Sequence, residues 1–567
     1  MLSNIKNLSL TKKLAYKIVF FIFCLIPFFS GLDSIPPLDR DESRFVQSTY
    51  QMIETNDYIN IKFLDEIRAK KPIGIYWAQS IFANIFGEDK ISSYRYVSTL
   101  GALITILVLW KFSQILFGQK ASLFVVSASM ISLLFIFESH VAKTDTLLLS
   151  FITFQQYLLL KIILNKKKSI LFDLIIPISM WLVLGIGFLI KGPISLVVFI
   201  FTLSSYVLWN KDINLLKNIR PFWGVICFMI IVLPWVYIIQ KTTDGLFFEK
   251  AINEDFLPKL FSEQESHGGY PGYYFLISSL IFWPLASFFP LAFFFVKNNL
   301  NNLGIRFLIC WLVPFWIIIE FIPTKLFHYP LPIFSPLILI VAGTMIYFEN
   351  NKLNLKSFIS KNAVFLFSLL FSLGGIVLSL FLCYLLINFN ENKTDQYLYI
   401  AILFLISFLI LILSILVNIK VIYGKNFNFF NFKKEIKFQN YIIFFSVIFY
   451  ITIFTFILPS LKYLFPSKII SDELKKLNYE ELSVTGYHEP SLVFLAKGKI
   501  ILSDPNEAAI FLAEGNNNLV LVEGRELDEF INSSSNLNLK LKKIREIKGF
   551  NYSKGQNIKI LFFKVAK

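Results

Sequence analysis

The residues best suited to chemistry lie in short charged segments between long apolar runs. In the first segment, PPLDRDESRF, Asp41 is a carboxylate that could accept a proton from an attacking hydroxyl or align a nucleophile. Arg44 adds a cation close by. In the next segment, DEIRAKKPIGIYW, Lys71 precedes the interfacial aromatic Tyr76, a composition suited to holding a lipid phosphate at headgroup depth. These segments predict a carboxylate and a phosphate-binding cation at a membrane surface.

Three further segments add charged residues. ESHVAKTD places Lys143 and Asp145 between two apolar runs, and Asp145 is the second candidate for a catalytic carboxylate. Lys191 ends another apolar run and, like Arg44, could support Lys71 in stabilising a leaving phosphate. The segment EFIPTKLFHYPLP precedes an apolar helix. The predicted substrate pocket comprises Glu42, Tyr76, Lys143, Lys325, His328 and Tyr329.

A metal site is one reading of the histidines. His267 lies with Glu265 in the glycine-rich loop EQESHGGYPGYY, and a zinc-like divalent cation there would need further ligands. The chain has four histidines but no HExxH pattern or paired ligand spacing. This favours a polar loop histidine, with a metal at His267 kept as an alternative.

The first charged segment also has a purely structural reading. Asp39 and Glu42 have the spacing of a capping box at the start of a helix. Phe45, Thr49, Met52 and Ile53 would then share one face of an amphipathic helix lying along the membrane. Capping requires neither Asp41 nor Arg44, so these two remain for chemistry.

Composition indicates a polytopic membrane protein. Hydrophobic residues make up 56% of the 567 positions, 64 are Phe, and mean hydropathy is +0.63. The first apolar run (14–32) has no small-residue cleavage site after it, so we expect a retained anchor. The four cysteines all lie in apolar runs, and we expect no disulfide framework. The net charge of +16 reflects loop placement rather than nucleic-acid binding.

Thirteen apolar runs are long enough to span a bilayer. They start near 14, 92, 121, 146, 171, 193, 221, 272, 303, 329, 362, 397 and 439. One set of alternate loops is rich in Lys and Arg, whereas the short opposite loops hold one each: Lys143, Lys191, Lys325 and Lys393. The basic set is therefore predicted to be cytoplasmic. Three long segments then lie outside: 33–90, 241–271 and the chain after about 465.

The sequence predicts two domains. Residues 1–465 form the transmembrane domain, with interfacial helices in the first outer loop (33–90) and a second long outer loop (241–271). Residues 466–567 form a small α/β domain. Its predicted strands are SVTGY, SLVFLAKGKIILS, NNLVLVE and KILFFKV, and its predicted helices are SDELKKLNYEE, DPNEAAIFLAEG and GRELDEFINSS.

Six motifs carry a resemblance to a known family. LDRDESRF, KKPIGIYW, AKTDTLLL, LIKGP, HGGYPGYY and PTKLFHYPLP occur in order, all on the predicted outer face. In this the chain resembles bacterial GT-C glycosyltransferases of the aminoarabinose-transferase (ArnT-like) type, relatives of the protein O-mannosyltransferases. The resemblance runs from about residue 30 to 340 and continues more weakly beyond.

The resemblance implies an enzyme of the bacterial inner membrane with a periplasmic C-terminal domain. Such an enzyme moves a sugar, an aminoarabinose-like pentose or a hexose, from a polyprenyl-phosphate donor to lipid A or another envelope acceptor, with inversion. By motif, Asp41 matches the acid central to catalysis, Arg44 its basic neighbour and Asp145 the acid of the second outer loop. Lys71 matches the lysine that grips the carrier phosphate.

Two further positions are carried over by the same motifs. Tyr329 matches an aromatic before a Leu-Pro step, and His267 matches a histidine that can bind zinc. The family has a glutamate just before the phosphate-binding lysine, where this chain has Lys70. A metal shared between that position and His267 is therefore disfavoured.

Other functions remain open at this point. A GT-C enzyme of the same fold could transfer mannose or another hexose to a protein or polysaccharide. A transporter of lipid-linked sugars would need polar groups along the spans, whereas here the charges gather at the outer helix ends. We expect a monomer that binds membrane lipids and no nucleic acid.

Overall fold

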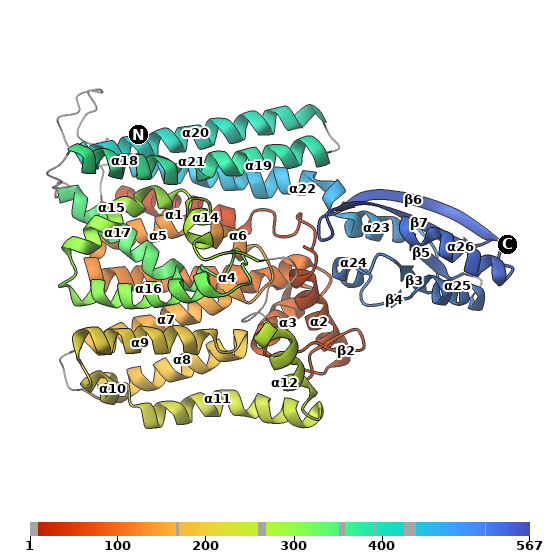
Figure 1. Ribbon diagram of the computed structural model, residues 1–567, viewed down its shortest axis with the longest axis horizontal. Coiled ribbons are helices and arrows are strands. Elements are labelled where there is room, and N and C mark those ends of the chain that lie inside the picture. The colour runs from red at the N-terminus through yellow and green to blue at the C-terminus, as the bar shows by residue number, and fades with distance from the viewer. Residues whose placement is uncertain are drawn as a thin grey trace.

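The protein is a bundle of apolar helices with a sheet domain at one end (Figure 1). The computed structural model describes residues 10–165, 169–258, 268–350, 358–390, 393–423, 438–515 and 517–566. The expected class, a polytopic helical membrane protein with a C-terminal α/β domain, is confirmed.

Nine helices in the described part of the chain are long and apolar enough to cross a membrane, or eleven if two bent pairs each count as one span. The predicted number of thirteen is not confirmed. The nine spans are Ile91–Phe117, Asp145–Leu164, Asp173–Lys191, Pro221–Thr242, Leu303–Phe321, Leu331–Phe348, Lys361–Phe389, Asp395–Tyr423 and Gln439–Ser460. The first five contain α4 (Ile91–Phe117), α7 (Asp145–Leu164), α8 (Ile176–Lys191), α11 (Pro221–Thr242) and α16 (Leu303–Phe321). The other four belong to α17 (Phe334–Asn350), α18 (Phe358–Ser372) with α19 (Gly374–Phe389), α20 (Lys393–Tyr423), and α21 (Phe438–Ile451) with α22 (Leu458–Ser460).

Two predicted spans are bent. Helices α5 (Gln119–Ser129) and α6 (Leu133–Ser139) meet at 63°, and α14 (Tyr273–Ile281) meets the segment Leu285–Asn298, which contains α15 (Phe289–Asn298), at 113°. Two more apolar helices are shorter: the Val19–Phe29 part of α1 (Leu10–Phe29), and α9 (Ile194–Asn210).

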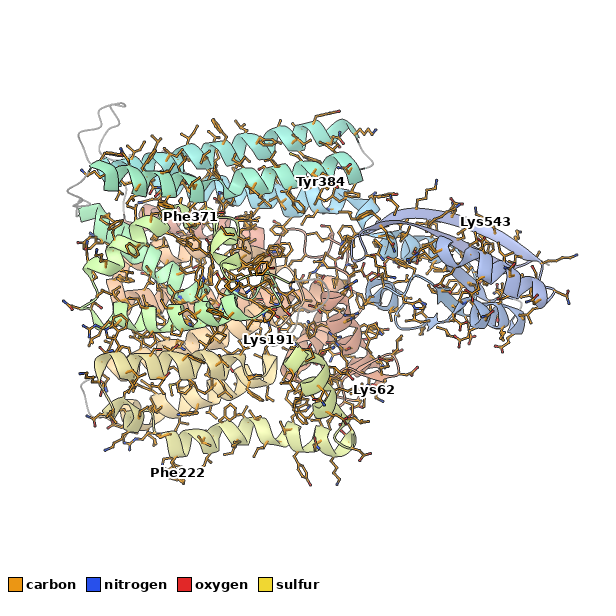
Figure 2. The ribbon with its side chains drawn as sticks, viewed as in Figure 1. Lys62, Lys191, Phe222, Phe371, Tyr384 and Lys543 are labelled. Carbon is orange, nitrogen blue, oxygen red and sulfur yellow. The ribbon has the colours of Figure 1, made fainter. Side chains whose placement is uncertain are left out.

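The outer surface of the bundle is apolar. Figure 2 marks Phe222 and Tyr384 on this surface, and their exposed fractions are 72% and 58%. Large hydrophobic side chains are exposed on most of the spanning helices. Exposure on this scale suits contact with lipid rather than water.

The first outer segment contains α2 (Asp41–Thr55), a hairpin of β1 (Lys62–Phe63) with β2 (Glu66–Ile67), and α3 (Gly74–Phe86). The predicted capping box is wrong. The residue before helix α2 is Arg40, and its side chain does not cap the helix. Glu42, the expected capping partner of Asp39, pairs with Arg95 instead. The side chain of Glu42 accepts from the Leu38 amide instead of from Asp39.

Helix α2 is buried on more than the predicted face. Phe45, Thr49, Met52 and Ile53 are buried as expected. The opposite side is also covered, because Tyr50 packs edge to face against Phe494 of α24 (Pro490–Leu495) in the C-terminal domain. The helix therefore lies between the two parts of the molecule.

The C-terminal domain is built on a five-stranded mixed sheet of order β4-β3-β5-β7-β6. The strands are β3 (Leu482–Thr485), β4 (Ile501–Leu502), β5 (Leu519–Glu523), β6 (Leu541–Asn551) and β7 (Gln556–Val565). Strands β3 and β5 are parallel and buried throughout, because α23 (Pro466–Leu474) and α24 cover one face and α25 (Pro505–Glu514) and α26 (Leu527–Asn536) the other.

Two sequence predictions in this domain need correction. The stretch SLVFL, predicted as a strand, is helix α24, which begins at Pro490 as proline at a first helical turn allows. Strand β6 was not predicted, because charged residues are frequent in its sequence, as suits an exposed edge of the sheet, where Lys543 is marked in Figure 2.

Candidate active site

The charged residues singled out in the sequence gather at the end of the bundle that faces the sheet domain (Figure 1). Asp41 begins α2, Asp145 begins α7 (Asp145–Leu164) and Lys191 ends α8 (Ile176–Lys191). Figure 2 shows Lys191 toward this end of the bundle. His328 and Tyr329 precede the helical turn η5 (Leu331–Ile333). Segments far apart in the chain thus supply one cluster.

Asp145 is buried and engaged in an ion pair. Lys191 Nζ donates to Asp145 Oδ1, and His328 Nε2 lies 3.9 Å from the same oxygen. Lys143 pairs with Glu138 on the same wall, at 3.2 Å. With its charge already balanced, Asp145 is suited to ordering the site rather than to accepting a proton.

The pKa values of His328 and Lys143 are shifted in opposite directions. Burial lowers the pKa of His328 to about 3, so its imidazole is neutral at physiological pH. Burial also disfavours the charge of Lys143, but the carboxylates of Glu138, Asp145 and Asp41 outweigh it and raise the pKa of Lys143 above its usual value. Lys143 therefore remains a cation within the cluster.

Asp41 is the accessible carboxylate. Burial by the surrounding residues disfavours the negative charge of Asp41. The positive charges of Lys143, Arg68 and Lys71 outweigh this effect and hold the pKa of Asp41 below its usual range. Its side chain is nevertheless exposed to solvent, in contrast to that of Asp145. Asp41 is therefore an ionised carboxylate that an entering molecule can reach.

Lys71 lies before α3 and pairs with an acid from the second long outer loop. Its Nζ is 2.9 Å from Asp255 Oδ2, and it also donates to the carbonyl oxygen of Lys70 at 2.7 Å. Asp255 belongs to the short π-helix η3 (Ala251–Phe256), which follows α12 (Leu246–Lys250). The Lys71 side chain is 19% exposed, so an anion arriving from solvent can reach it.

Glu42 forms a buried ion pair. One edge of the Arg95 guanidinium donates two hydrogen bonds to its carboxylate, Nε to Oε1 at 2.9 Å and Nη2 to Oε2 at 2.8 Å. Oε1 also accepts from the Ala142 amide at 2.7 Å, next to Lys143. Glu42 thus ties α2 to α4 (Ile91–Phe117) and to the loop before α7, and its four contacts leave it 1% exposed.

Replacing Glu42 by Ala is expected to destabilise the protein by roughly 3–5 kcal/mol, because Arg95 would remain buried without its counter-ion. The measurement is thermal unfolding in detergent micelles. Glu54→Ala, at an exposed position of the same helix, is the control and should unfold near the wild-type temperature. Equal unfolding temperatures for the two variants would contradict the prediction.

The remaining predicted pocket residues differ in their surroundings. Tyr76 is fully buried, with its ring 5.6 Å from that of Phe45. Lys325 donates to the Ile319 and Glu320 carbonyl oxygens and lies over the Tyr274 ring, so its contacts are with the end of α16 (Leu303–Phe321). Tyr329 and Arg44 are half-buried, and Arg44 lies one turn beyond Asp41.

The predicted metal ligand His267 lies outside the described residues. Within the described ranges, no group of three or more His, Cys, Asp or Glu side chains is arranged to hold a metal ion. Lys70, which stands where the family has a glutamate, is an exposed cation. Among the described residues, the surroundings of Lys70 therefore supply cations rather than a set of metal ligands.

Sequence reasoning missed three charged residues of this region: Arg68, Arg95 and Asp255. Arg68 is in the same segment as Lys71, and its guanidinium stacks over the Phe45 ring at 5.1 Å. Arg95 lies just inside the start of a predicted span, and an arginine at such a position is the available signal. Asp255 has no distinguishing local pattern.

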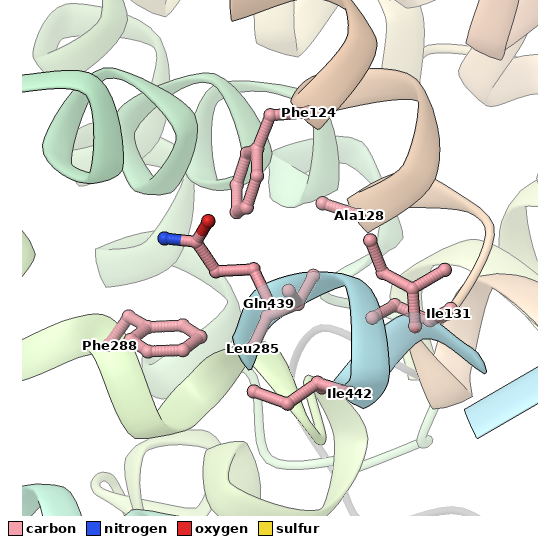
Figure 3. A pocket seen from close by; sticks show the side chains of 8 residues that line it. Phe124, Ala128, Ile131, Leu285, Phe288, Gln439 and Ile442 are labelled. Atoms are coloured by element: carbon pink, nitrogen blue, oxygen red, sulfur yellow. The ribbon is translucent and has the colours of Figure 1, made fainter. Parts of the chain in front are cut away.

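An apolar cavity lies apart from these charges. Phe124, Phe288 and Ile442 line it, and the Gln439 amide is its main polar group (Figure 3). Without a titratable side chain it offers no acid, base or cation. The charged cluster around Asp41 is therefore the candidate active site.

Sequence comparisons point to membrane glycosyltransferases. Residues 70–238 match the family model described as dolichyl-phosphate-mannose-protein mannosyltransferase. The undecaprenyl phosphate-alpha-4-amino-4-deoxy-L-arabinose arabinosyl transferase of Aeromonas hydrophila is 23% identical over 342 residues, covering 59% of this chain and 60% of that protein. A transferase of the same description from Proteus mirabilis is 22% identical, covering 57% of this chain and 58% of that protein. The chain thus spans about three fifths of the length of these relatives.

Structural comparison covers nearly the whole chain. ArnT from Cupriavidus metallidurans bound to undecaprenyl phosphate superposes with a TM-score of 0.74 at 15% identity, covering 96% of this chain and 98% of that one. The apo form of the same protein gives 0.73 at 15% identity, covering 98% and 99%. In sequence the chain resembles these transferases, and in fold it is an ArnT-like GT-C membrane protein.

Proposed function

We propose that this protein is an inverting glycosyltransferase that moves a sugar from a polyprenyl-phosphate donor to an acceptor of the cell envelope. The observation that carries the proposal is the accessible, ionised carboxylate of Asp41 within a cluster of cations that includes Lys71 and Lys143. The donor supplies an anionic phosphate and the acceptor supplies a nucleophile, and the cluster has a complementary group for each. The relatives' names, which include undecaprenyl phosphate, support the same donor class.

The reaction follows from these roles. The acceptor oxygen forms a bond to C1 of the sugar while the bond from C1 to the carrier phosphate breaks. Lys71, with Arg44 in support, stabilises the negative charge that develops on the phosphate. If the acceptor is a hydroxyl, its proton passes to Asp41. If the acceptor is a phosphate, no proton is transferred, and Asp41 aligns it or offsets charge at C1.

The buried pair of Lys191 and Asp145 orders this site. It fixes the start of α7 against the end of α8, and the neutral His328 ring lies against it. We assign Asp145 and Lys191 to positioning, and Tyr329, Tyr76 and Lys143 to the wall against which the substrates bind. Glu42 supports that wall through Arg95.

The proposal places the protein in the bacterial inner membrane, as a monomer with the active site and C-terminal domain facing the periplasm. The distribution of Lys and Arg between alternate loops supports this orientation. The acceptor is lipid A or another envelope molecule, and the sugar is an aminoarabinose-like pentose or a hexose. A protein or polysaccharide acceptor is the second candidate, supported by the mannosyltransferase family match.

Mass spectrometry of lipid A, glycan and protein fractions from cells with and without the gene tests this function. A pentosamine or hexose that is absent only from the deletion strain would identify the sugar and the acceptor. Identical spectra for all three fractions, together with no transfer by purified protein from undecaprenyl-phosphate-linked sugars, would reject the proposal.

Replacing Asp255 by Asn is expected to tighten binding of undecaprenyl phosphate severalfold. The Asp255 carboxylate is 2.9 Å from Lys71 Nζ and competes with a phosphate for the same cation. Titration of purified protein with undecaprenyl phosphate measures the effect. Glu254→Gln, at the exposed neighbouring position, is the control. Weaker binding in the Asp255 variant would mean that Asp255 supports Lys71 instead of competing with the donor.

A further inference from the structure

The turn directly before Asp41 has a strained backbone. Arg40 has φ 65° and ψ −97°, a combination that residues other than glycine rarely adopt. A conformation of this kind is unfavourable and persists only where surrounding contacts hold it. The contacts that hold Arg40 therefore also determine where α2 begins and where Asp41 lies.

The C-terminal domain supplies contacts to Arg40 and to the residue before it. The backbone amide of Asp39 donates to the hydroxyl of Tyr552, and the Asp39 carboxylate accepts from the amide of Ser491 at 3.1 Å. Arg40 Nη2 donates to the carbonyl oxygen of Ser553 at 2.9 Å. Three hydrogen bonds, two from the β6–β7 turn and one from the start of α24, thus hold two successive residues.

The loops that make these contacts are themselves held in place. Asn551 accepts from the amides of Ser553 and Lys554 and donates to Glu489 Oε1 at 2.7 Å. This fixes the turn between β6 and β7 against the start of α24. Tyr552 and Ser553 are therefore presented to Arg40 by an ordered turn.

The bundle holds the other side of the same turn. Glu42, paired with Arg95, accepts from the Leu38 amide at 2.8 Å, and Ser43 Oγ donates to the Leu38 carbonyl oxygen at 2.6 Å. Asp41 is thus the exposed member of a turn whose neighbours are held by both parts of the molecule.

We propose that the C-terminal domain positions the carboxylate of Asp41, through the hydrogen bonds of Tyr552, Ser491 and Ser553 to the Asp39–Arg40 turn. The effect of this positioning on turnover rests on the proposed glycosyl transfer. The ordering of the Asp39–Arg40 turn by the C-terminal domain does not depend on that function. Tyr552, Ser491 and Ser553 are positioning residues, because their hydrogen bonds to Asp39 and Arg40 act on Asp41 through the turn. The sheet domain is then needed for turnover even if substrates bind only to the bundle.

Tyr552→Phe tests the proposal because it removes one acceptor and keeps the ring. Hydrogen exchange of the peptide covering residues 36–45 should become faster, since the Asp39 amide loses its partner. Turnover should fall about 10- to 100-fold, as small misplacement of a reacting group does. The KM for the donor and the dissociation constant of undecaprenyl phosphate should stay within about twofold of wild type, because Lys71 is on another segment.

Two further variants complete the experiment. Asp39→Ala removes the acceptor of Ser491 and should give the same faster exchange and loss of turnover. Tyr463→Phe is the matched control, because its hydroxyl contacts Asn557 of the sheet domain. It should match the wild type in both measurements.

The outcomes separate this inference from the proposed function. Unchanged exchange at residues 36–45 in both Tyr552→Phe and Asp39→Ala would overturn the positioning role. Equal loss of turnover and donor binding, with lower unfolding temperature, would also overturn it in favour of general docking. If exchange rises but even the wild type transfers no sugar, the hold on the turn is supported and the proposed function is rejected.

Discussion

Asp41→Asn is expected to reduce turnover at least about 100-fold while leaving the protein folded and inserted in the membrane. The substitution keeps the shape of the side chain and removes its negative charge. Nearby cations keep the Asp41 pKa low, so the wild-type group is ionised at physiological pH and available as a base or an anion. An amide provides neither.

Transfer from a polyprenyl-phosphate-linked sugar, followed by mass spectrometry of the product, is the measurement for Asp41→Asn. Asp65→Asn serves as the control, because Asp65 is an exposed acid in the same outer segment. It should retain wild-type turnover. A variant at Asp41 that keeps more than about a tenth of wild-type turnover would contradict the catalytic assignment of Asp41.

Lys71→Ala has the second large expected effect, a loss of donor binding. A hydrogen bond to a charged group contributes about 1.5–3 kcal/mol, so the dissociation constant of undecaprenyl phosphate should rise roughly 10- to 150-fold. Turnover should fall as well, because the leaving phosphate loses its stabilising cation. Both quantities are measured on the purified protein, by titration with the carrier lipid and by the transfer assay.

The neighbouring residue provides a matched control for Lys71. Lys70→Ala removes one positive charge at an exposed position, and it leaves intact the backbone oxygen that accepts from Lys71. It should bind the carrier lipid as the wild type does. Equal weakening in both variants would show a diffuse electrostatic effect and would contradict a specific contact at Lys71.

The double substitution Lys71→Ala with Asp255→Asn links these experiments. If Asp255 acts only by competing for Lys71, its substitution should have no effect once the lysine is gone. The double variant should then bind undecaprenyl phosphate as weakly as Lys71→Ala alone. Restored binding in the double variant would assign Asp255 a direct repulsion of the phosphate.

Local sequence patterns were sufficient for part of the architecture. Long apolar runs indicated a polytopic helical protein, and the shift in pattern after about residue 465 indicated an α/β domain. The edge strand β6 escaped prediction because charged residues are frequent in its sequence. SLVFL was misassigned because so short an apolar run does not distinguish the periodicity of a helix from that of a strand. In the folded protein it is a helix that packs against α2.

The capping box shows how tertiary contacts override a local motif. Asp39 and Glu42 have the spacing for mutual capping, yet Glu42 pairs with Arg95, 53 positions away, and Asp39 binds Ser491, 452 positions away. Both arrangements give the two carboxylates hydrogen-bond donors. Burial favoured the distant partners, because a buried arginine needs a carboxylate more than an exposed helix end needs a cap.

The sequence alone determined which chemistry was available: carboxylates, lysines and aromatics at the ends of apolar runs, with Asp41 and Lys71 foremost among them. The tertiary structure decided how they differ. It buried Asp145 against Lys191, left Asp41 open among cations, and brought Asp255 to Lys71 across 184 positions. The physical reason is that residue type sets the charge a side chain can carry, whereas its partners and access to solvent depend on segments that only folding brings together.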